Sequence, residues 1–249
     1  MRETDTAIRP RPSDSTIYTR EAAEMGLFDF TYYDIICRNA GLFKQKTAWY
    51  EAETTEAVSF QELKKMTDSL ASGLRTRGIG KGDRIGVLAK NSLQYFLLYG
   101  AAAALGAVML PINWRLSAGE VCFNLNDGQT KIVFADEEFG ETISKIRAEL
   151  PIVERFYALS GKIATAGDFY DLIMQADDFQ PEDLPADSGF VIIHTAAVAG
   201  RPRGALLSHT NIVFSSLEFI RAMSLQAADV HLNILPLFHV GGLFMTISC

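Results

Sequence analysis

The sequence is short of cysteine, of net positive charge and of long apolar runs, and each shortage argues against a class of protein. Its three cysteines are an odd number without a CxxC spacing, which argues against a disulfide framework and a zinc site: Cys37, Cys122 and Cys249. The formal net charge is −7 and lysine and arginine form no cluster, which argues against a nucleic-acid-binding protein. We therefore expect a protein of the reducing cytoplasm that holds any anionic ligand with local groups.

The longest apolar run, residues 96–112, is too short and too interrupted for a membrane span. A span needs about 20 strongly apolar residues, whereas this run is rich in alanine and contains Gly100, Gly106 and Pro111. Residues 1–28 are charged and lack the apolar core of a secretory signal, so we interpret them as an arm. The composition, 48% hydrophobic and 21% charged, is typical of a soluble globular protein.

Helix and strand patterns alternate along the chain from residue 59 onward. Ser59 and Glu62 have the spacing of a capping box, and they predict a helix that ends at Gly78. The next elements are predicted as a strand, a helix that begins at Asn91 and a strand: 84–89, 91–106 and 107–112.

The same unit then repeats. Ser117 and Glu120 have a second capping-box spacing in front of a helix. A strand, a helix and a strand are predicted after it: 131–136, 137–150 and 154–159. Strands that alternate with helices imply an α/β fold with layered αβα architecture and a mostly parallel sheet.

Residues 160–188 differ in composition from the rest. Seven acidic residues accompany a single lysine there, and Pro181 and Pro185 interrupt regular structure, so we interpret the segment as an acidic surface connection. It contains one predicted short helix, at 168–176.

A further α/β pattern follows the connection. A strand at 189–195 precedes a loop and a second strand, Asn211 is predicted to cap a helix at 212–223, and another buried strand is predicted at 231–238. The chain stops at Cys249 in an uncapped element, as the N-terminal part of a longer protein would. We divide it into an arm, a first α/β subdomain, the acidic connection and the start of a second α/β subdomain: 1–28, 29–159, 160–188 and 189–249.

Two glycine-rich loops compete as nucleotide sites. Residues 78–86 lie in front of a strand and lack the GxGxxG spacing, so a helix stop and a tight turn explain them better than a dinucleotide site. No GxxxxGK[ST] loop occurs. The loop that ends at Gly204 lies between two strands and contains Gly200, Pro202 and Arg203. It can curl its N–H groups around an anion beside the guanidinium or form a plain hairpin, and the residues alone leave both alternatives open.

Three segments in order carry a resemblance to a known family. The stretch "IIHTAAVAGRPRGALLSHTNI", residues 192–212, resembles the phosphate-binding loop of the adenylate-forming (AMP-binding) enzymes, the superfamily of acyl-CoA synthetases and related ligases. Residues 78–136 resemble the N-terminal region of acyl-CoA synthetases, and residues 233–243 resemble their acyl-pocket segment. The resemblance implies the N-terminal part of the large domain of acyl-CoA synthetase-like enzymes.

The family resemblance implies an AMP-forming acyl-CoA ligase. In such enzymes a carboxylate attacks the α-phosphate of ATP to give an acyl-adenylate and pyrophosphate, and the thiol of coenzyme A then displaces AMP. ATP, Mg²⁺, coenzyme A and a fatty or other organic acid are therefore the implied ligands. By matched position, the phosphate loop comprises Thr195, Ala196, Ala197, Val198, Ala199, Gly200, Arg201, Pro202, Arg203 and Gly204. The implied acyl-pocket residues are His239, Gly241 and Gly242.

The loop departs from the usual family pattern, Ser/Thr-Ser-Gly-Ser/Thr-Thr-Gly-x-Pro-Lys-Gly. The stretch 196–199 reads Ala-Ala-Val-Ala, so three hydroxyls and one glycine are missing, and Arg203 replaces the usual lysine. Main-chain N–H groups survive these changes and arginine offers more donors than lysine. We therefore expect weakened phosphate binding rather than its loss.

Other family features have no counterpart before Cys249: the aromatic-Gly-x-Thr-Glu segment, the ribose-binding aspartate, the hinge and the lysine of the C-terminal domain. The resemblance thus implies no catalytic residue and no metal ligand in this chain, and we expect no acyl-adenylate formation by the chain alone. His194 and His209 receive no chemical role. Residues 113–115 match structural positions at the start of a helix: Asn113, Trp114 and Arg115.

Two other interpretations remain at this point. One is a non-catalytic nucleotide- or acyl-binding relative with a degenerate loop, and the other is a purely structural α/β domain. Motifs downstream of Cys249 would separate them from the ligase. We also expect apolar surface to remain uncovered near residues 189–194 and 233–238, and homodimers or aggregates to form through it.

Overall fold

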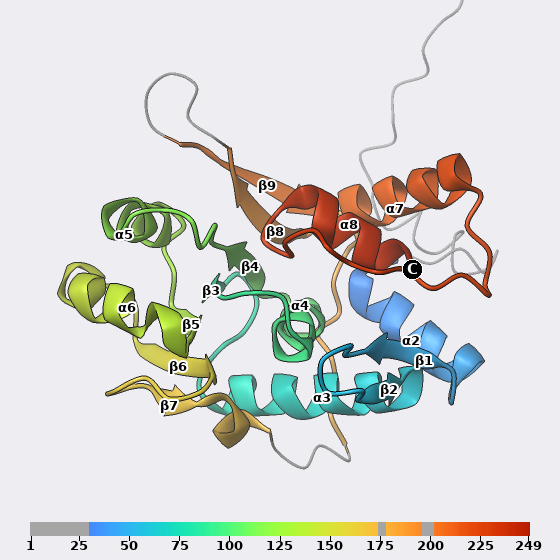
Figure 1. The fold of residues 1–249 in the computed structure, drawn as a ribbon, viewed down its shortest axis with the longest axis horizontal. Helices are drawn as coiled ribbons and strands as arrows, with labels where there is room; N and C mark the ends of the chain where they lie inside the picture. Colours follow the sequence, from blue (N-terminus) through green and yellow to red (C-terminus); the bar gives the residue numbers. More distant parts are fainter. Residues whose placement is uncertain (1–29, 174–177, 196–201) are drawn as a thin grey trace, which may run out of the picture.

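The computed structural model describes residues 30–173, 178–195 and 202–249, which form three layers with a sheet in the middle (Figure 1). Seven strands in the described ranges follow the order β7-β6-β5-β3-β4-β8-β9, and all neighbours pair in parallel except β8 and β9. The strands are β3 (Arg84–Leu88), β4 (Val108–Pro111), β5 (Ile132–Asp136), β6 (Arg155–Ser160), β7 (Gly167–Asp168), β8 (Gly189–His194) and β9 (Gly204–Ser208). The predicted layered α/β class with a mostly parallel sheet is confirmed.

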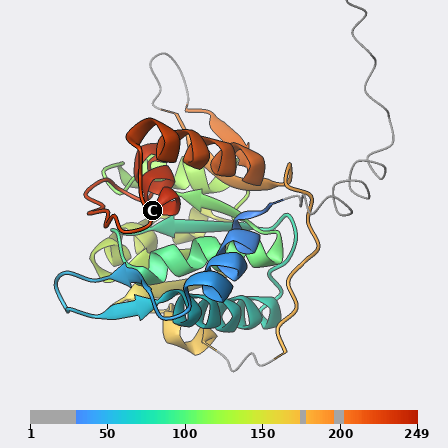
Figure 2. The same cartoon turned by 90° about the vertical axis from the view of Figure 1, so that its right-hand side faces the viewer.

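Alternate residues of the neighbouring strands β5 and β6 enter different cores, as the period of two in a strand requires. In β5, Ile132 and Phe134 pack into one core, whereas Val133 and Ala135 pack into the other. The first core includes α2 (Tyr32–Phe43), α3 (Phe60–Thr76) and α4 (Leu93–Leu105), and the second includes α5 (Ala118–Asp127) and α6 (Gly140–Ile146). The sheet is thus covered on both faces (Figure 2).

Two predicted helix starts are confirmed, and each is fixed by side chains that lie close together in the sequence. Ser59 and Ser117 each accept the N–H of the glutamate three residues on, and that glutamate accepts from the serine in return. The third predicted helix start, at Asn91, is wrong by two residues. Helix α4 begins at Leu93 behind a Ser92 cap, so the Asn91 side chain takes no part in capping it.

Helix α4 is buried along its whole length except at Gln94, between the sheet and the other two helices of its layer. Gly100 makes the close approach possible, because a Cβ there would lie 2.9 Å from Thr67 and 3.0 Å from Ile36. Gly106 ends the helix in the left-handed region, with φ of 67°. The run 96–112 is therefore a helix and a strand, and within the described residues no helix is long and apolar enough to span a membrane.

The helix and the hairpin that precede α3 were not predicted from the sequence. Helix α2 carries a capping box between Thr31 and Asp34, the same local signal that predicted α3. It is followed by an antiparallel hairpin of β1 (Thr47–Tyr50) and β2 (Ala57–Ser59).

Two predicted helices are shorter than expected. The segment 137–150 is broken into η1 (Glu137–Phe139), α6 and η2 (Arg147–Glu149). Gly140 lies at the first break, where its low helix propensity favours interruption. The predicted helix at 168–176 is reduced to a single turn, η3 (Phe169–Leu172), because Ile173 has extended backbone angles; residues 174–177 lie outside the described ranges.

The predicted strand at 231–238 does not form. A strand needs a neighbouring edge for its main-chain groups, and no described strand pairs with this segment. In its first half Leu232 is 75% and Ile234 80% exposed, whereas Leu237 and Phe238 at its end are buried. The segment instead connects α7 (His209–Met223) with α8 (Val240–Ser248).

The acidic connection returns along the outside of the helical layer to the second half of the chain (Figure 2). The Arg75 guanidinium donates to the Gln180 carbonyl over 2.8 Å, and the Glu182 N–H donates to the Ala104 carbonyl over 2.9 Å. After it, β8 joins the same sheet as β3 to β7. The proposed subdomain boundary near residue 189 stays a prediction.

Candidate functional site

The predicted phosphate loop joins two paired strands. His194 pairs with Gly204 at the last register position of β8 and β9. Beyond it, the Thr195 N–H donates to the Arg203 carbonyl over 3.0 Å, and the Thr195 hydroxyl lies 3.4 Å from the same oxygen. The two described ends of the loop are therefore joined at its base, which we call the neck: Thr195, Arg203 and Gly204. Residues 196–201 lie outside the described ranges: Ala196, Ala197, Val198, Ala199, Gly200 and Arg201.

The neck carries one exposed positive charge. Arg203 is exposed and forms no ion pair within the described ranges. Gly204 lets the strands close, because a Cβ there would lie 2.7 Å from the Ile192 side chain. A free guanidinium beside main-chain groups is suited to a phosphate, since it presents several donors in a fixed fork.

His194 anchors the neck to helix α5. Its Nε2 lies 3.0 Å from the Asp127 carboxylate, and its side chain is only 6% exposed. The Nδ1 atom is buried and has no hydrogen-bond partner within the described ranges. The pair joins the base of the loop to Asp127, the last residue of α5.

His209 fixes the other end of the hairpin. It is fully buried at the first position of α7, where it stacks on Phe190 with ring centroids 4.7 Å apart. Its Nδ1 accepts the Tyr32 N–H over 3.2 Å, and burial lowers its pKa to about 4 although Asp34 acts in the opposite direction. The imidazole is therefore neutral in the fold.

The predicted cap of this helix was wrong by one turn. Helix α7 begins at His209 behind a Ser208 cap, and Asn211 closes the capping box from inside the helix. The chain thus passes from β9 into α7 without a connecting loop, because Ser208 ends the strand and caps the helix at once.

The acyl-pocket motif is held at the carboxyl edge of the sheet by two side chains. The Asn91 amide donates to the Leu235 carbonyl and accepts the Leu237 N–H, both over 2.8 Å. The Tyr99 hydroxyl donates to the Leu237 carbonyl over 2.9 Å. The main chain that failed to form a strand is thus satisfied by side chains of the β3–α4 unit, a contact that no local sequence signal indicated.

An aromatic contact supports the same segment. Trp114 packs edge-on against Phe238, with ring centroids 6.3 Å apart, and the Arg115 guanidinium lies 4.1 Å from the Trp114 ring centre. Asn113 accepts the Arg115 N–H over 3.0 Å and fixes this turn. The stretch 113–115 therefore packs against the acyl-pocket motif in front of α5, whose cap is Ser117.

The three predicted acyl-pocket residues lie at the start of α8. His239 is exposed and caps the helix, since its Nδ1 accepts the Gly241 N–H over 3.1 Å. A Cβ on Gly241 would meet only ordinary contacts, whereas a Cβ on Gly242 would lie 2.2 Å from the Pro236 carbonyl oxygen. The space at Gly242 is filled by the protein itself, so room for a substrate depends on Gly241 and on the orientation of His239.

The ends of the central strands lie close to this motif. Asp136 at the end of β5 accepts the Lys90 N–H over 2.8 Å and the Ser160 hydroxyl over 2.7 Å. Burial raises the pKa of this carboxyl, although both hydrogen bonds act against the shift. Lys90 pairs with Glu138 over 2.8 Å. These groups join the ends of β3, β5 and β6 at the edge where open α/β sheets bind ligands.

Metal ligands do not gather in the described part of the chain. Within it, His, Cys, Asp and Glu form no group of three or more that could hold an ion. Thr195 and Arg203 at the neck offer a hydroxyl and a cation, which suit phosphate oxygens but do not form a site for Mg²⁺.

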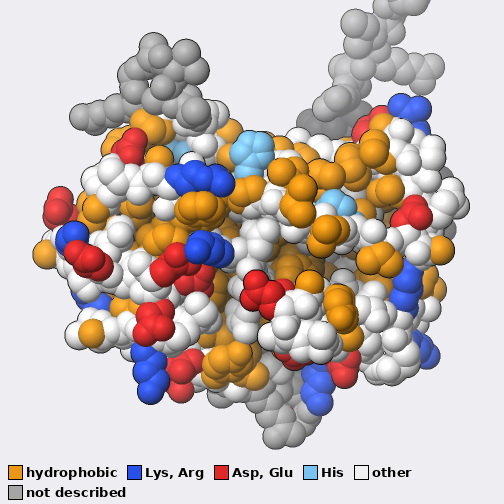
Figure 3. All heavy atoms as spheres, viewed as in Figure 1, with side chains coloured by type: hydrophobic (Ala, Val, Ile, Leu, Met, Phe, Trp, Pro, Cys, Tyr) orange, Lys and Arg blue, Asp and Glu red, His pale blue; other side chains and the backbone are white. Residues whose placement is uncertain are grey.

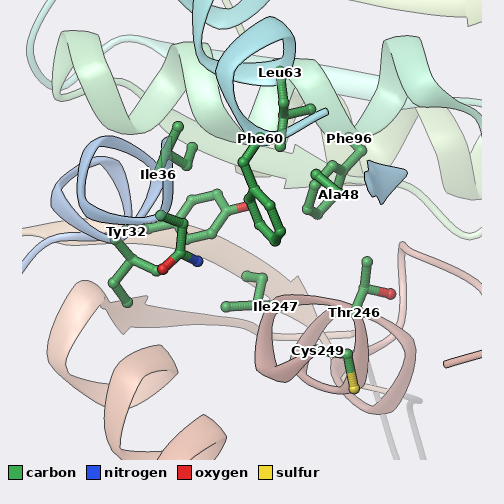
Figure 4. Close-up of a pocket in the computed structure, with 11 residues that line it drawn as sticks. Tyr32, Ile36, Ala48, Phe60, Leu63, Phe96, Thr246, Ile247 and Cys249 are labelled. Carbon is green, nitrogen blue, oxygen red and sulfur yellow. The ribbon is translucent and has the colours of Figure 1, made fainter. Parts of the chain in front are cut away.

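A small apolar cavity lies where α8 meets the helical layer (Figure 4). Tyr32 and Ile36 from α2, Phe60 from α3 and Ile247 from α8 converge on it. Its volume of about 40 Å³ suits water molecules and is too small for a fatty acyl chain.

The chain matches known proteins over most of its length. A family model described as AMP-binding enzyme matches residues 37–249. The fatty acid–[acyl-carrier-protein] ligase ScoC of Streptomyces coeruleorubidus is 30% identical over 75% of this chain and 36% of its own length. The long-chain-fatty-acid–CoA ligase of Thermus thermophilus is 28% identical over 85% of this chain and 40% of its own length. The chain thus spans well under half of these curated relatives.

Solved structures share the fold. A protein of Rhodopseudomonas palustris assigned as a long-chain-fatty-acid CoA ligase is 38% identical with a TM-score of 0.82, over 88% of this chain and 55% of that one. The inhibitor-bound N-terminal domain of FACL13 from Mycobacterium tuberculosis is 26% identical with a TM-score of 0.76, over 88% of this chain and 54% of that one. Because the family model covers residues 37–249, the chain belongs to the AMP-binding enzyme family of adenylate-forming ligases.

Proposed function

We propose that this chain is the phosphate-gripping and acyl-positioning part of an AMP-forming acid–thiol ligase. The substrates would be a fatty or other organic acid, ATP and coenzyme A, in line with the ligases to which the chain is similar. The observation that carries the proposal is the hairpin neck, where Arg203 stands exposed and unpaired within the described ranges next to Thr195.

The neck would hold the β- and γ-phosphates of ATP, which leave as pyrophosphate. ATP supplies the activated phosphorus atom, and the contribution of the protein to such transfers is mainly positioning and neutralisation of charge. Arg203 would supply the cation and the Thr195 hydroxyl a donor, with the main-chain N–H groups that the loop sequence retains as further donors. The contact between His194 and Asp127 would hold the neck in position against α5.

The start of α8 would receive the carboxylic acid. His239 is exposed at the helix start, and Asn91 and Tyr99 hold the chain in front of it at the sheet edge. An acid bound there would approach the hairpin from the carboxyl ends of the parallel strands. Mg²⁺ would be held by the phosphates and by groups other than those of the described neck.

Calorimetric titration with pyrophosphate tests the phosphate part of the proposal. We expect millimolar binding that Arg203→Ala weakens about tenfold or more and Arg203→Lys weakens less, because a charge-assisted hydrogen bond contributes about 1.5–3 kcal/mol. Arg221→Ala is the matched control, since Arg221 is an exposed arginine paired with Glu218 on α7. Equal binding by Arg203→Ala and the parent chain would refute the proposed grip.

The reaction itself is tested on the protein that carries this chain by acid-dependent exchange of pyrophosphate into ATP. Exchange that depends on a fatty acid and is lost in Arg203→Ala supports the ligase. Pyrophosphate binding without any exchange would instead identify a relative that binds nucleotide but does not catalyse the reaction.

A further inference from the structure

The small cavity between α2, β1, α3 and α8 has a lining that suits an alkyl chain better than water (Figure 4). Seven of its eleven lining residues have no polar side-chain atom, among them Ile36, Leu63 and Ile247. A water molecule inside a protein usually makes about two to four hydrogen bonds, which such a lining does not offer at most positions. None of the residues assigned above to phosphate or acid binding lines this cavity.

One polar group in the cavity lacks a partner. The Tyr32 side chain points into the cavity, and its hydroxyl lies beside Phe60 (Figure 4). Tyr32 is only 3% exposed, and within the described ranges its hydroxyl forms no hydrogen bond, whereas its main-chain N–H donates to His209. A nearly buried hydroxyl without a partner is unfavourable. Because Tyr32 lines the cavity, a molecule inside it reaches this hydroxyl and supplies the missing bond.

The Tyr32 ring is held in one orientation before a ligand binds. It packs edge-on against Phe96, with ring centroids 6.3 Å apart, and at a tilt against Phe190, with ring centroids 5.5 Å apart. The hydrogen bond from its N–H to the His209 Nδ1 spans 3.2 Å and fixes the main chain at the same residue. Burial raises the pKa of the Tyr32 phenol, so the group keeps its proton and acts as a donor.

The size of the cavity limits a ligand to a few non-hydrogen atoms. A volume of about 40 Å³ holds about three or four water-sized groups, at about 10–15 Å³ for each. The Thr246 hydroxyl, which also lines the cavity, is already used, because it donates to the Gly242 carbonyl of its own helix over 2.7 Å. Asn39 adds an amide group to the lining. A matching molecule therefore has a short apolar chain and a single hydroxyl group.

We propose that this cavity binds a short aliphatic alcohol with two or three carbon atoms. Its alkyl chain lies among Ile36, Leu63 and Ile247, and its oxygen accepts the Tyr32 O–H. The alcohol replaces water molecules that the apolar lining leaves short of hydrogen bonds. The site is separate from the proposed ligase chemistry and does not depend on it.

A series of 1-alkanols tests the size of the site, with affinities measured by titration in saturation-transfer NMR. We expect dissociation constants in the millimolar range, since so small a ligand makes few contacts. The affinity should rise about fourfold from ethanol to 1-propanol, because one more methylene group is buried. It should rise no further from 1-butanol to 1-hexanol, because the cavity is full. An affinity that rose by the same factor at every step up to 1-hexanol would indicate binding to exposed apolar surface and overturn the proposal.

Tyr32→Phe tests the hydrogen bond. It should weaken the binding of 1-propanol about fivefold and leave 1-chloropropane, which has the same number of non-hydrogen atoms but no hydroxyl, at its parent affinity. Tyr33→Phe is the matched control, because Tyr33 lies on the same helix but donates its hydroxyl to Asp68 and does not line the cavity. The same change for both probes in Tyr32→Phe, or an equally large effect of Tyr33→Phe on 1-propanol, would contradict the proposed bond.

Two further variants assign the binding to this cavity. Ala48→Leu places a larger side chain in the lining and should abolish the binding of 1-propanol. Ile247→Ala enlarges the cavity and should make 1-pentanol bind more tightly than it binds to the parent chain. Urea denaturation establishes that each variant is folded, and Ile247→Ala decides the question if Ala48→Leu does not fold. Parent-like affinities in a folded variant would place the alcohol elsewhere and overturn the proposal.

Discussion

The imidazole of His209 accepts the main-chain N–H of Tyr32 over 3.2 Å and thereby joins the end of the hairpin β8–β9 to the start of α2. The two residues are 177 positions apart in the sequence. Because Nδ1 must keep its lone pair to accept this bond, the contact exists only while the ring is neutral. The attachment of the proposed phosphate hairpin to the helical layer is therefore sensitive to acid.

The first prediction concerns this pH dependence. The folded imidazole has a pKa of about 4, whereas an unfolded one titrates near 6.5, so the unfolded state binds more protons between these values. The free energy of unfolding should fall as the pH decreases from 7 to 4.5, with a contribution from His209 on the order of 3 kcal/mol at the acid end. Urea denaturation at several pH values measures it.

The control for this prediction is His209→Asn, which keeps an acceptor near the position of Nδ1 but cannot be protonated. Its stability should depend less steeply on pH than that of the parent chain. Parallel profiles for the parent and His209→Asn would contradict the assignment.

The second prediction concerns Asn91. Its replacement by alanine leaves the Leu237 N–H and the Leu235 carbonyl without their partner, and Leu237 is fully buried. We expect a loss of about 2–3 kcal/mol in the free energy of unfolding and faster hydrogen exchange at the Leu237 amide. Asn91→Asp, which keeps only the acceptor, should lie between.

Asn233 provides a comparison within the same segment, since its side chain accepts one exposed N–H, that of Leu235, over 3.1 Å. Asn233→Ala should cost no more than about 1 kcal/mol. If Asn91→Ala were no more destabilising than Asn233→Ala, the acyl-pocket segment would be held by packing and by the Tyr99 hydrogen bond rather than by Asn91.

These contacts show which parts of the protein could be predicted from its sequence. The starts of α3 and α5 were predictable because Ser59 and Ser117 find their partners three residues away. Asn91 was misread as a helix start because its partners lie 144 and 146 residues further along the chain. Local hydrogen bonds are visible in a sequence, whereas distant ones depend on the fold.

The strand prediction at 231–238 failed for a related reason. Its apolar pattern indicates a surface that favours burial, but strand structure also requires an adjacent edge, which no described strand provides. The prediction of two strands joined by a loop at β8–β9 was correct, because both strands lie within the same short segment. The chemistry proposed for its loop comes from the family resemblance, because the residues of the loop alone are also compatible with a plain hairpin.

The third prediction addresses the missing hydroxyls of the loop. Ala199→Thr with Ala197→Gly restores one donor and removes a Cβ where the family has glycine. We expect pyrophosphate affinity to increase about tenfold, because a hydrogen bond to a charged group contributes about 1.5–3 kcal/mol. Calorimetry checks this, with Ala166→Thr as a control outside the loop. Unchanged affinity would mean that the main chain and Arg203 already supply the binding.

The fourth prediction concerns the apolar surface formed by Phe214 and Leu217 of α7 and by Val230, Leu232 and Ile234 beyond it. Apolar side chains gather over α7, α8 and the chain between them (Figure 3). Exposed apolar surface of this kind favours association, since burial of a large aliphatic side chain contributes about 1.5–3 kcal/mol. We expect the chain to dimerise with increasing concentration in light scattering.

Leu232→Glu with Ile234→Glu should weaken the dimer at least about tenfold, because two such contributions are lost and two like charges are brought together. Leu42→Glu, at a separate exposed leucine on α2, should not. A monomer at all concentrations would show that this surface is compatible with water despite its composition, and an equal effect of Leu42→Glu would move the contact to α2.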